Sequence, residues 1–177
     1  MKLKHCLECG AKLILKPCGD EGDIPFCESC GLFRFPVFST AISTAVLNHD
    51  KSKILLIQQY NRPHYILLAG YVNKGEDAEA TLVREVKEEV GLQVTGYQYM
   101  RSEYYEPNNT LMLNFVSVVD SEDLSGLTAE VDHGQWFTWE EAVQAIAKNS
   151  LAERFLLNIV QKLQSGSIHV ETRPSGL

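Results

Sequence analysis

Residues 70–92 constrain the fold of this chain more tightly than any other segment. Aliphatic residues recur at helical spacing within residues 78–90, which predicts a helix there. The stripe of that helix expected to face the core consists of Leu82, Val83, Val86 and Val90. Glu85, Glu88 and Glu89 fall at positions i, i+3 and i+4 of the same helix. Three carboxylates are therefore expected to crowd one face.

These three carboxylates repel one another, at a cost of about 0.2–0.5 kcal/mol for each like-charged pair. The intervening cation, Lys87, projects away from them. A bound divalent cation would remove the repulsion, and hard carboxylate oxygens suit Mg²⁺ or Mn²⁺. The alternative is an ordinary acidic helix face exposed to solvent. The three glutamates alone do not decide between these two interpretations.

The full spacing of the segment favours the metal site. It matches the pattern G-x₅-E-x₇-R-E-U-x-E-E-x-G-U, in which U is aliphatic, at Gly70, Glu76, Arg84, Glu85, Val86, Glu88, Glu89, Gly91 and Leu92. On these residues the chain resembles the Nudix hydrolases. The resemblance implies an α/β fold, built as an α/β/α sandwich around a mixed sheet. Strands interspersed with helices along the chain agree with that class.

The resemblance also implies an enzyme that hydrolyses a nucleoside diphosphate linked to another group, with Mg²⁺ or Mn²⁺ as cofactor. The implied metal ligands are Glu85 and Glu89, together with the backbone carbonyl of Ala69. Glu88 is implied to share an ion or to act through water. The general base differs among members of the family, and its candidates here are Glu89 and acidic residues outside the segment.

Two further residues of the segment are implied to support this metal site. The guanidinium of Arg84 can bind a carboxylate with two parallel hydrogen bonds. By resemblance it pairs with Glu76, which fixes the loop before the helix and orients the glutamates. Gly70 lets the backbone come close to metal and phosphate, because it has no side chain.

Cysteines define a second site near the N-terminus. Four of the five form two Cys-x-x-Cys pairs, Cys6 with Cys9 and Cys27 with Cys30. Two such pairs close a tetrahedral zinc shell without an open position, which predicts a structural Zn²⁺. Disulfides and a redox motif are the alternatives. Cys18 has no partner at this spacing and is predicted to be a free thiol.

These sites divide the chain into a zinc ribbon at residues 1–35, a Nudix domain at 36–165 and a loose tail at 166–177. About 30 residues cannot build a core unaided, so the metal is expected to supply folding free energy to the ribbon. The first residues lack the apolar core of a secretory signal, so a reducing cytoplasmic location is expected, where disulfides are disfavoured.

Charge and hydropathy limit the expected partners. The 177 residues carry a net charge of −7, which argues against a nucleic-acid binder as the main function. No apolar run approaches the roughly 20 residues of a membrane span, so no membrane partner is expected. A homodimer is implied by resemblance alone.

A zinc ribbon ahead of such a domain is similar to the NADH pyrophosphatase branch of the family. That branch has a segment S-Q-P-W-P-F-P-x-S-L-M, and here residues 102–112 keep Ser102, Leu111 and Met112 but not the proline-rich centre. Tyr105 stands in place of the tryptophan. Tyr104 and Tyr105 are candidates to stack on a nucleobase, with half-buried strand aromatics as the alternative.

The branch also has a metal-binding glutamate three residues before a tryptophan. Relative to Trp136, that place is held by His133, and Asp132 and Glu130 are nearby candidates to replace the glutamate. The expected substrate is NAD(H) or an ADP-ribose compound, with AMP released. One rival interpretation is a zinc-ribbon binding or sensor protein with a vestigial Nudix domain. Another is an enzyme that removes an NAD cap from RNA with the same site.

Overall fold

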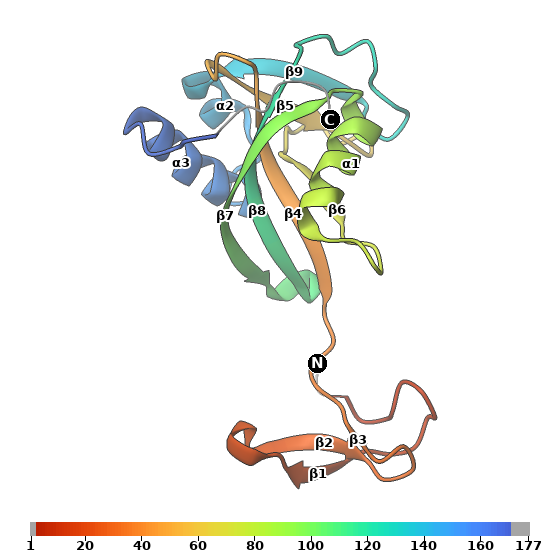
Figure 1. The fold of residues 1–177 in the computed structure, drawn as a ribbon. Helices are drawn as coiled ribbons and strands as arrows, with labels where there is room; N and C mark the ends of the chain where they lie inside the picture. The colour runs from red at the N-terminus through yellow and green to blue at the C-terminus, as the bar shows by residue number, and fades with distance from the viewer. Residues whose placement is uncertain (1–2, 171–177) are drawn as a thin grey trace. The chain divides into compact units, whose positions relative to one another are not determined.

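The computed structural model describes residues 3–170, and it divides the chain into two compact units, Met1–Phe38 and Ser39–Leu177. The first unit is a small antiparallel sheet in the order β1-β2-β3 (Figure 1). Its elements are β1 (Ile14–Pro17), the 3₁₀ turn η1 (Gly19–Glu21), β2 (Asp23–Cys27) and β3 (Leu32–Phe33). Among its described residues only Cys6 and Cys27 are buried, so this unit has no hydrophobic core of its own.

The second unit is built on a six-stranded mixed sheet in the order β7-β8-β4-β5-β9. Its elements are β4 (Ser39–Leu47), β5 (Lys53–Gln58), β6 (Leu68–Tyr71), α1 (Ala78–Val90), β7 (Val94–Tyr105), the 3₁₀ turn η2 (Glu106–Asn108), β8 (Thr110–Val119), β9 (His133–Thr138), α2 (Trp139–Ala145) and α3 (Leu151–Gln164). β4 and β8 are parallel, and the other pairs are antiparallel. The short strand β6 pairs with β4 alone.

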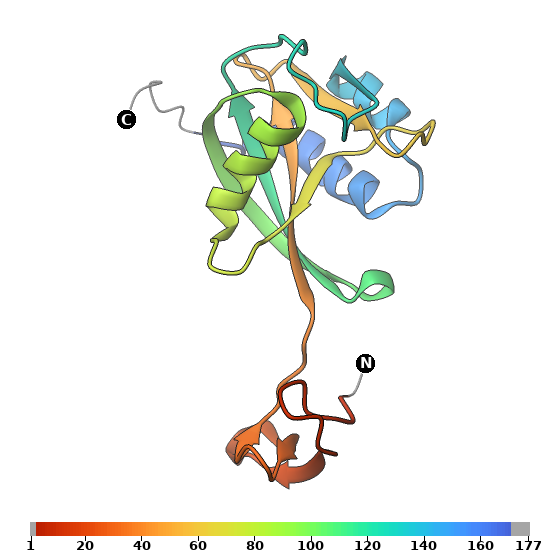
Figure 2. The same cartoon turned by 90° about the vertical axis from the view of Figure 1, so that its right-hand side faces the viewer.

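Helices cover both faces of this sheet. Figures 1 and 2 show α1 on one face and α2 and α3 on the other. Alternation along the central strands supplies a core to each side, because successive side chains of a strand point to opposite faces. On β4, Val46 packs toward α1, whereas Ala45 and Leu47 pack toward α2 and α3. The predicted α/β/α sandwich with a mixed sheet is confirmed.

The ends of α1 follow from local chemistry. The side chain of Asp77 accepts a hydrogen bond from the Ala80 N–H at 2.7 Å, which satisfies one of the free donors at the helix start. Gly91 closes the helix in the left-handed conformation at φ 75°. The observed helix has the predicted bounds, but Val83 is 41% exposed and lies outside the buried stripe.

The C-terminal segment is more ordered than its composition predicts. Ile168 and Val170 are buried in the core beneath α2 and α3. Within residues 166–170 of the predicted loose tail, the hydrophobic effect therefore holds two aliphatic side chains of an otherwise polar segment. Residues 171–177 of the predicted tail lie outside the described residues. Within residues 3–170, no helix is long and apolar enough to cross a membrane.

Candidate active site and metal centre

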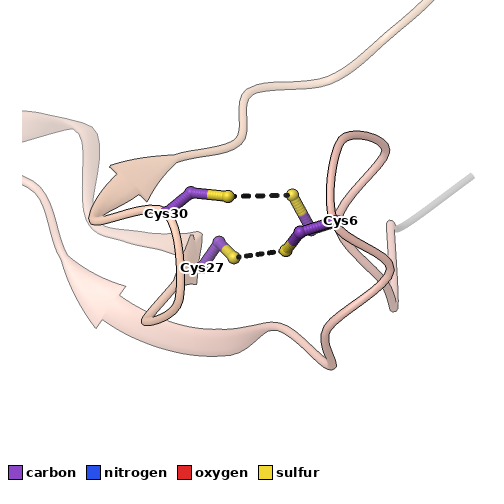
Figure 3. Close-up of side chains that lie close together, drawn as sticks. Cys6, Cys27 and Cys30 are labelled. Carbon is purple, nitrogen blue, oxygen red and sulfur yellow. Dashed lines mark hydrogen bonds between the residues drawn. The ribbon is translucent and has the colours of Figure 1, made fainter.

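The four paired cysteines converge on one point in the first unit. Their sulfur atoms all lie within 4.8 Å of one another. Figure 3 shows the side chains of Cys6, Cys27 and Cys30 turned toward this point. The Sγ atoms of Cys6 and Cys30 are 3.9 Å apart, and those of Cys9 and Cys27 are 3.5 Å apart. Four thiols at this separation fit the tetrahedral shell that zinc prefers. The fifth cysteine, Cys18, is outside the cluster.

Glycines shape the turns that carry these sulfurs. Gly10 and Gly31 follow the second cysteine of each pair and have φ of 74° and 68°, which is the region that favours glycine. Each turns the chain back so that its N–H donates to the carbonyl of the first cysteine of its pair. Backbone N–H groups of Cys9 and Glu8 lower the pKa of Cys6 to about 6, which favours the thiolate that a metal needs.

In the second unit, the buried face of α1 carries two of the predicted glutamates. Glu85 is 9% exposed and Glu89 is 4% exposed, because they lie one turn apart beside the apolar stripe of the helix. Glu88 faces outward, with its side chain 59% exposed. The sequence predicted that the three glutamates crowd one face. In the structure they instead divide into a buried pair and one member at the rim.

Burial changes the proton affinity of this pair. Loss of solvation raises the pKa of Glu89 to about 7, opposed by a 3.0 Å hydrogen bond that Gln59 donates to its Oε1. Loss of solvation also raises the pKa of Glu85, opposed by the Arg84 guanidinium. Among the described residues, Oε2 of Glu89 is buried without a hydrogen-bond partner. An unpartnered buried carboxylate oxygen next to a second carboxylate fits a divalent cation.

Arg84 links the glutamates to the loop before α1. Its Nε and Nη2 donate to the two carboxylate oxygens of Glu76 at 2.8 and 2.9 Å, which is the predicted paired arrangement. Its Nη1 donates to Glu85 and Glu88 at 2.9 and 2.8 Å, and its Nη2 also donates to the carbonyl of Tyr71. These contacts lower the pKa of Glu76 to about 2, the Arg84 hydrogen bonds being the main cause.

Gly70 makes room for the carboxylate of Glu85. A Cβ at position 70 would lie 1.9 Å from Cδ and 2.0 Å from Oε1 of Glu85, closer than atoms can approach. The glycine therefore forms a cradle on β6 into which the side chain from α1 fits. This close approach is the local reason why a residue without a side chain is needed there.

The substitution Gly70→Ala should displace the Glu85 carboxylate without unfolding the protein, because a flexible side chain can move aside. We expect the affinity for Mn²⁺ to fall about 10- to 100-fold, as is usual when a group that positions a ligand is changed. Titration with Mn²⁺ followed by electron paramagnetic resonance measures it. The matched control is Gly134→Ala, where the added Cβ would meet Leu127 only at 3.4 Å. Equal Mn²⁺ affinity in both variants would contradict the cradle.

A cavity of about 360 Å³ opens beside these carboxylates. Its lining comprises Ala41, Tyr60, Ala69, Gly70, Tyr71, Asn73, Arg84, Glu85, Glu89, Tyr105, Asn108, Thr110, Met112 and Glu130. Ala45 on β4 and Val116 on β8 face α2 and α3. Because side chains alternate along a strand, the strand residues in the lining other than Gly70 point to this same face of the sheet. The cavity therefore reaches from the carboxylates on α1 around the short strand β6 to the opposite face.

The structure separates the two tyrosines proposed to contact a substrate. Tyr105 lines the cavity and pairs with Thr110. Tyr104 pairs with Leu111, so its side chain points to the other face, and its hydroxyl donates to Asn109. Tyr104 therefore does not line this cavity, and its contact with a substrate stays a prediction. Neighbouring residues of a strand alternate in direction, and the sequence prediction did not decide which of the two faced inward.

The sequence offered His133, Asp132 and Glu130 as candidates for an additional metal ligand, and one of them lines the cavity. That residue is Glu130, whose charge adds to the factors that raise the pKa of Glu89. Asp132 instead accepts a 2.6 Å hydrogen bond from the Asn61 N–H. His133 does not line the cavity, and its ring lies 6.1 Å from that of Tyr65.

The loop after β5 contributes residues that the sequence patterns did not identify. Gln59 holds Glu89, and Tyr60 lines the cavity while being 75% exposed. Tyr60 and Asn61 both have positive φ, 58° and 54°, which non-glycine residues seldom adopt. Such backbone strain gathers at functional sites. Tyr60 and Asn61 belong to no periodic pattern or motif, so the sequence alone did not mark them as part of a site.

A family comparison identifies this arrangement. The model of the NUDIX domain matches residues 38–158, which is more than half of the chain. The chain belongs to the Nudix family. The matched residues include the helix with the buried glutamates, the cradle on β6 and the strands that form the cavity. The predicted family is confirmed.

Individual relatives extend the similarity beyond the Nudix domain. The NAD-capped RNA hydrolase NudC of Pseudomonas aeruginosa is 29% identical over 164 residues, which cover 93% of this chain and 58% of that protein. NudC of Pseudomonas putida W619 is 29% identical over 80% of this chain and 51% of its own length. The chain thus spans little more than half the length of these curated relatives.

Solved structures show the same fold. A Nudix hydrolase from Nitrosomonas europaea aligns with a TM-score of 0.69 at 19% identity, and covers 93% of this chain and 94% of its own. The Nudix domain of Shewanella oneidensis NrtR, crystallised with ADP ribose, aligns with a TM-score of 0.59 at 16% identity over 76% of this chain and 91% of its own.

Proposed function

We propose that this Nudix protein hydrolyses the pyrophosphate bond of a nucleoside diphosphate linked to another group, in a reaction that depends on Mg²⁺ or Mn²⁺. The observation that carries the proposal is the buried pair Glu85 and Glu89 beside a cavity of about 360 Å³. Burying two carboxylates costs free energy unless a cation or a function compensates for it. A vestigial site would not need to keep this pair, so the pair also argues against the sensor interpretation.

The residues that would hold the cation are Glu85 and Glu89, with the Ala69 carbonyl and Glu88 at the rim. When bound, the cation would neutralise the pyrophosphate and activate a water molecule. Arg84 keeps Glu85 in place through its hydrogen bond, and its pairing with Glu76 holds the loop. We assign the uptake of the proton from the attacking water to a carboxylate of the site, with Glu89 and Glu130 as candidates.

The substrate class follows from the walls of the cavity and from the relatives. Tyr105 and Tyr60 offer aromatic faces on which a nucleobase can stack, each contact contributing about 1–3 kcal/mol. The relatives named NAD-capped RNA hydrolase and the neighbour solved with ADP ribose favour a substrate of the NAD(H) or ADP-ribose type. Water would add to one phosphorus as the bridging bond breaks, and AMP and the partner phosphate would leave.

A second candidate function is removal of an NAD cap from RNA. The printed name of the Pseudomonas aeruginosa relative favours it, and the reacting bond would be the same. The net charge of −7 favours the small nucleotide, because RNA binding gains most of its affinity from cationic contacts.

We also propose that the four clustered cysteines hold a structural Zn²⁺, and that the protein acts in the cytoplasm as a homodimer.

A substrate panel tests the proposal. The full chain is incubated with NADH, NAD, ADP-ribose and a short NAD-capped RNA in the presence of Mg²⁺ or Mn²⁺, and AMP or 5′-phosphorylated RNA is quantified. We expect AMP from at least one small dinucleotide, and no product after chelation of the divalent metal. Faster release from the capped RNA would favour the second candidate. No hydrolysis of any of the four with either metal would refute the proposal.

A further inference from the structure

Two residues of the cavity lining come from long loops. The floor of the cavity consists of strand residues such as Ala41 and Met112. Tyr60 instead belongs to the loop between β5 and β6, residues 59–67, and Glu130 to the loop between β8 and β9, residues 120–132. Loops are the more mobile parts of a fold, so the positions of these two wall residues depend on the contacts that fix their loops.

The segment around Glu130 is anchored to α1 and to the core. The Thr128 N–H donates to the carbonyl of Glu89 at 3.2 Å, and the Val131 N–H donates to the carbonyl of Thr128 at 3.1 Å, which closes a turn around Glu130. Val131 is 5% exposed and packs in the core on the α1 side. Besides loss of solvation, the charge of Glu130 raises the pKa of both Glu85 and Glu89, in agreement with its place in the lining.

The side chain of Asp132 joins the two loops. Its Oδ2 accepts a hydrogen bond of 2.6 Å from the Asn61 N–H, and its own N–H donates to the carbonyl of Gln58 at 2.9 Å. Asn61 directly follows Tyr60, and Asp132 lies two residues after Glu130. One carboxylate therefore connects the segments that carry both wall residues.

The turn at Tyr60 needs such a contact. Tyr60 and Asn61 have φ of 58° and 54°, a region that a bulky residue rarely adopts. Tyr60 is also 75% exposed, so burial of its ring does not offset this strain. Strained residues persist where the surrounding structure imposes their conformation. The bond to Asp132 falls on the second strained residue, and a carboxylate is a strong acceptor for a backbone N–H.

We propose that Asp132 is a positioning residue, which joins the two loops so that Tyr60 and Glu130 both lie at the cavity wall when the substrate binds. This inference rests on the proposed function, in which Tyr60 offers a face to a nucleobase and Glu130 is a candidate to take the proton from water. It gives Asp132 a role other than that of a metal ligand, because its Oδ2 is engaged by Asn61.

The test compares two substitutions of this residue. Asp132→Asn keeps an acceptor oxygen and removes the charge, whereas Asp132→Ala removes both. Steady-state kinetics are measured with Mg²⁺ on the fastest substrate of the panel described above. We expect Asp132→Ala to lower kcat/KM about 10- to 100-fold, because a small misplacement of a reacting group costs this much. Part of the loss should be a lower kcat and part a higher KM, and Asp132→Asn should stay close to the wild type.

A matched control lies on the same loop. Asp123 is exposed, and its carboxylate accepts hydrogen bonds from the N–H and the hydroxyl of Ser125, so its contacts are local. Asp123→Ala should therefore keep the kcat and the KM of the wild type.

Further measurements separate positioning from a general effect on structure. Tyr60→Leu should mainly raise KM, and Glu130→Gln should mainly lower kcat. Addition of Asp132→Ala to Glu130→Gln should lower kcat no further, because the group that it positions is already lost. The Asn61 amide proton should exchange slowly in the wild type and in Asp132→Asn, and faster in Asp132→Ala. The unfolding temperature should change little, since Asp132 is exposed.

Any of four results would overturn the inference. They are an Asp132→Ala variant with the kcat/KM of the wild type, an Asp132→Asn variant as impaired as Asp132→Ala, losses in kcat that add in the double variant, and unchanged exchange of the Asn61 amide in Asp132→Ala. All four presuppose an active wild type. A wild type that hydrolyses no substrate of the panel would instead contradict the proposed function, and the inference with it.

Discussion

The substitution Glu89→Gln is expected to lower turnover at least about a thousandfold and to leave the fold intact. The amide is isosteric but has lost the charge that would hold a cation, and several kcal/mol of transition-state stabilisation depend on that cation. Burial of the glutamine is easier than burial of the carboxylate, because the pKa of Glu89 is raised to about 7 by loss of solvation. The measurement combines AMP release with thermal unfolding.

When no divalent metal is present, Glu89→Gln should also change how the stability of the folded protein depends on pH. The pKa of Glu89 in the folded chain, about 7, lies above the ordinary glutamate value of 4.5, so the folded state binds its proton more tightly than the unfolded state. The wild type should therefore lose stability as the pH rises from about 4.5 to 7, and Glu89→Gln should lose less. At pH 8 the variant should be the more stable of the two.

A control on the same helix makes the result interpretable. Glu79 lies in the first turn of α1 and is exposed, so Glu79→Gln should retain turnover within about twofold and should follow the pH profile of the wild type. Substantial turnover by Glu89→Gln would remove this residue from the site. Loss of turnover together with a lower unfolding temperature would mean that Glu89 supports the fold instead.

Replacement of Cys27 by Ser should abolish zinc binding and unfold the first unit. Cys27 is completely buried, and in the described part of that unit only one other residue, Cys6, is buried. Hydrophobic burial therefore contributes little, and zinc in such sites supplies roughly 10–16 kcal/mol of apparent free energy. Elemental analysis should find one zinc per wild-type chain and none in the variant, and amide resonances of residues 3–38 should lose their dispersion.

The fifth cysteine provides the control for this experiment. Cys18 lies outside the cluster, so Cys18→Ser should keep one zinc per chain and the dispersed resonances. The second unit has its own core on both faces of its sheet and should keep its unfolding transition in both variants. A Cys27→Ser protein that retained zinc and an ordered first unit would exclude the four-thiolate site.

The sequence was sufficient where local chemistry decides the outcome. The helix at residues 78–90 has the predicted bounds, because aliphatic spacing, an N-terminal cap and Gly91 all act within the segment. The cysteine pairs meet as expected, since the spacing within each pair already places two sulfurs in one turn.

The remainder depended on packing between distant segments. The sequence did not separate Glu88 at the rim from Glu85 in the interior, because that difference arises from β6 lying against α1. It did not identify Gln59, whose contact with Glu89 joins a loop to a helix.

The course of the cavity around β6 has a consequence for how such a protein can change. The acids that would grip the cation come from one side of the sheet, whereas the floor that would choose the substrate lies on the other. Substitutions in the floor can alter ligand preference while the acids keep their positions. Descendants of one ancestral scaffold could thus acquire different substrates by exchanging a few strand residues, and protein engineers could follow the same route.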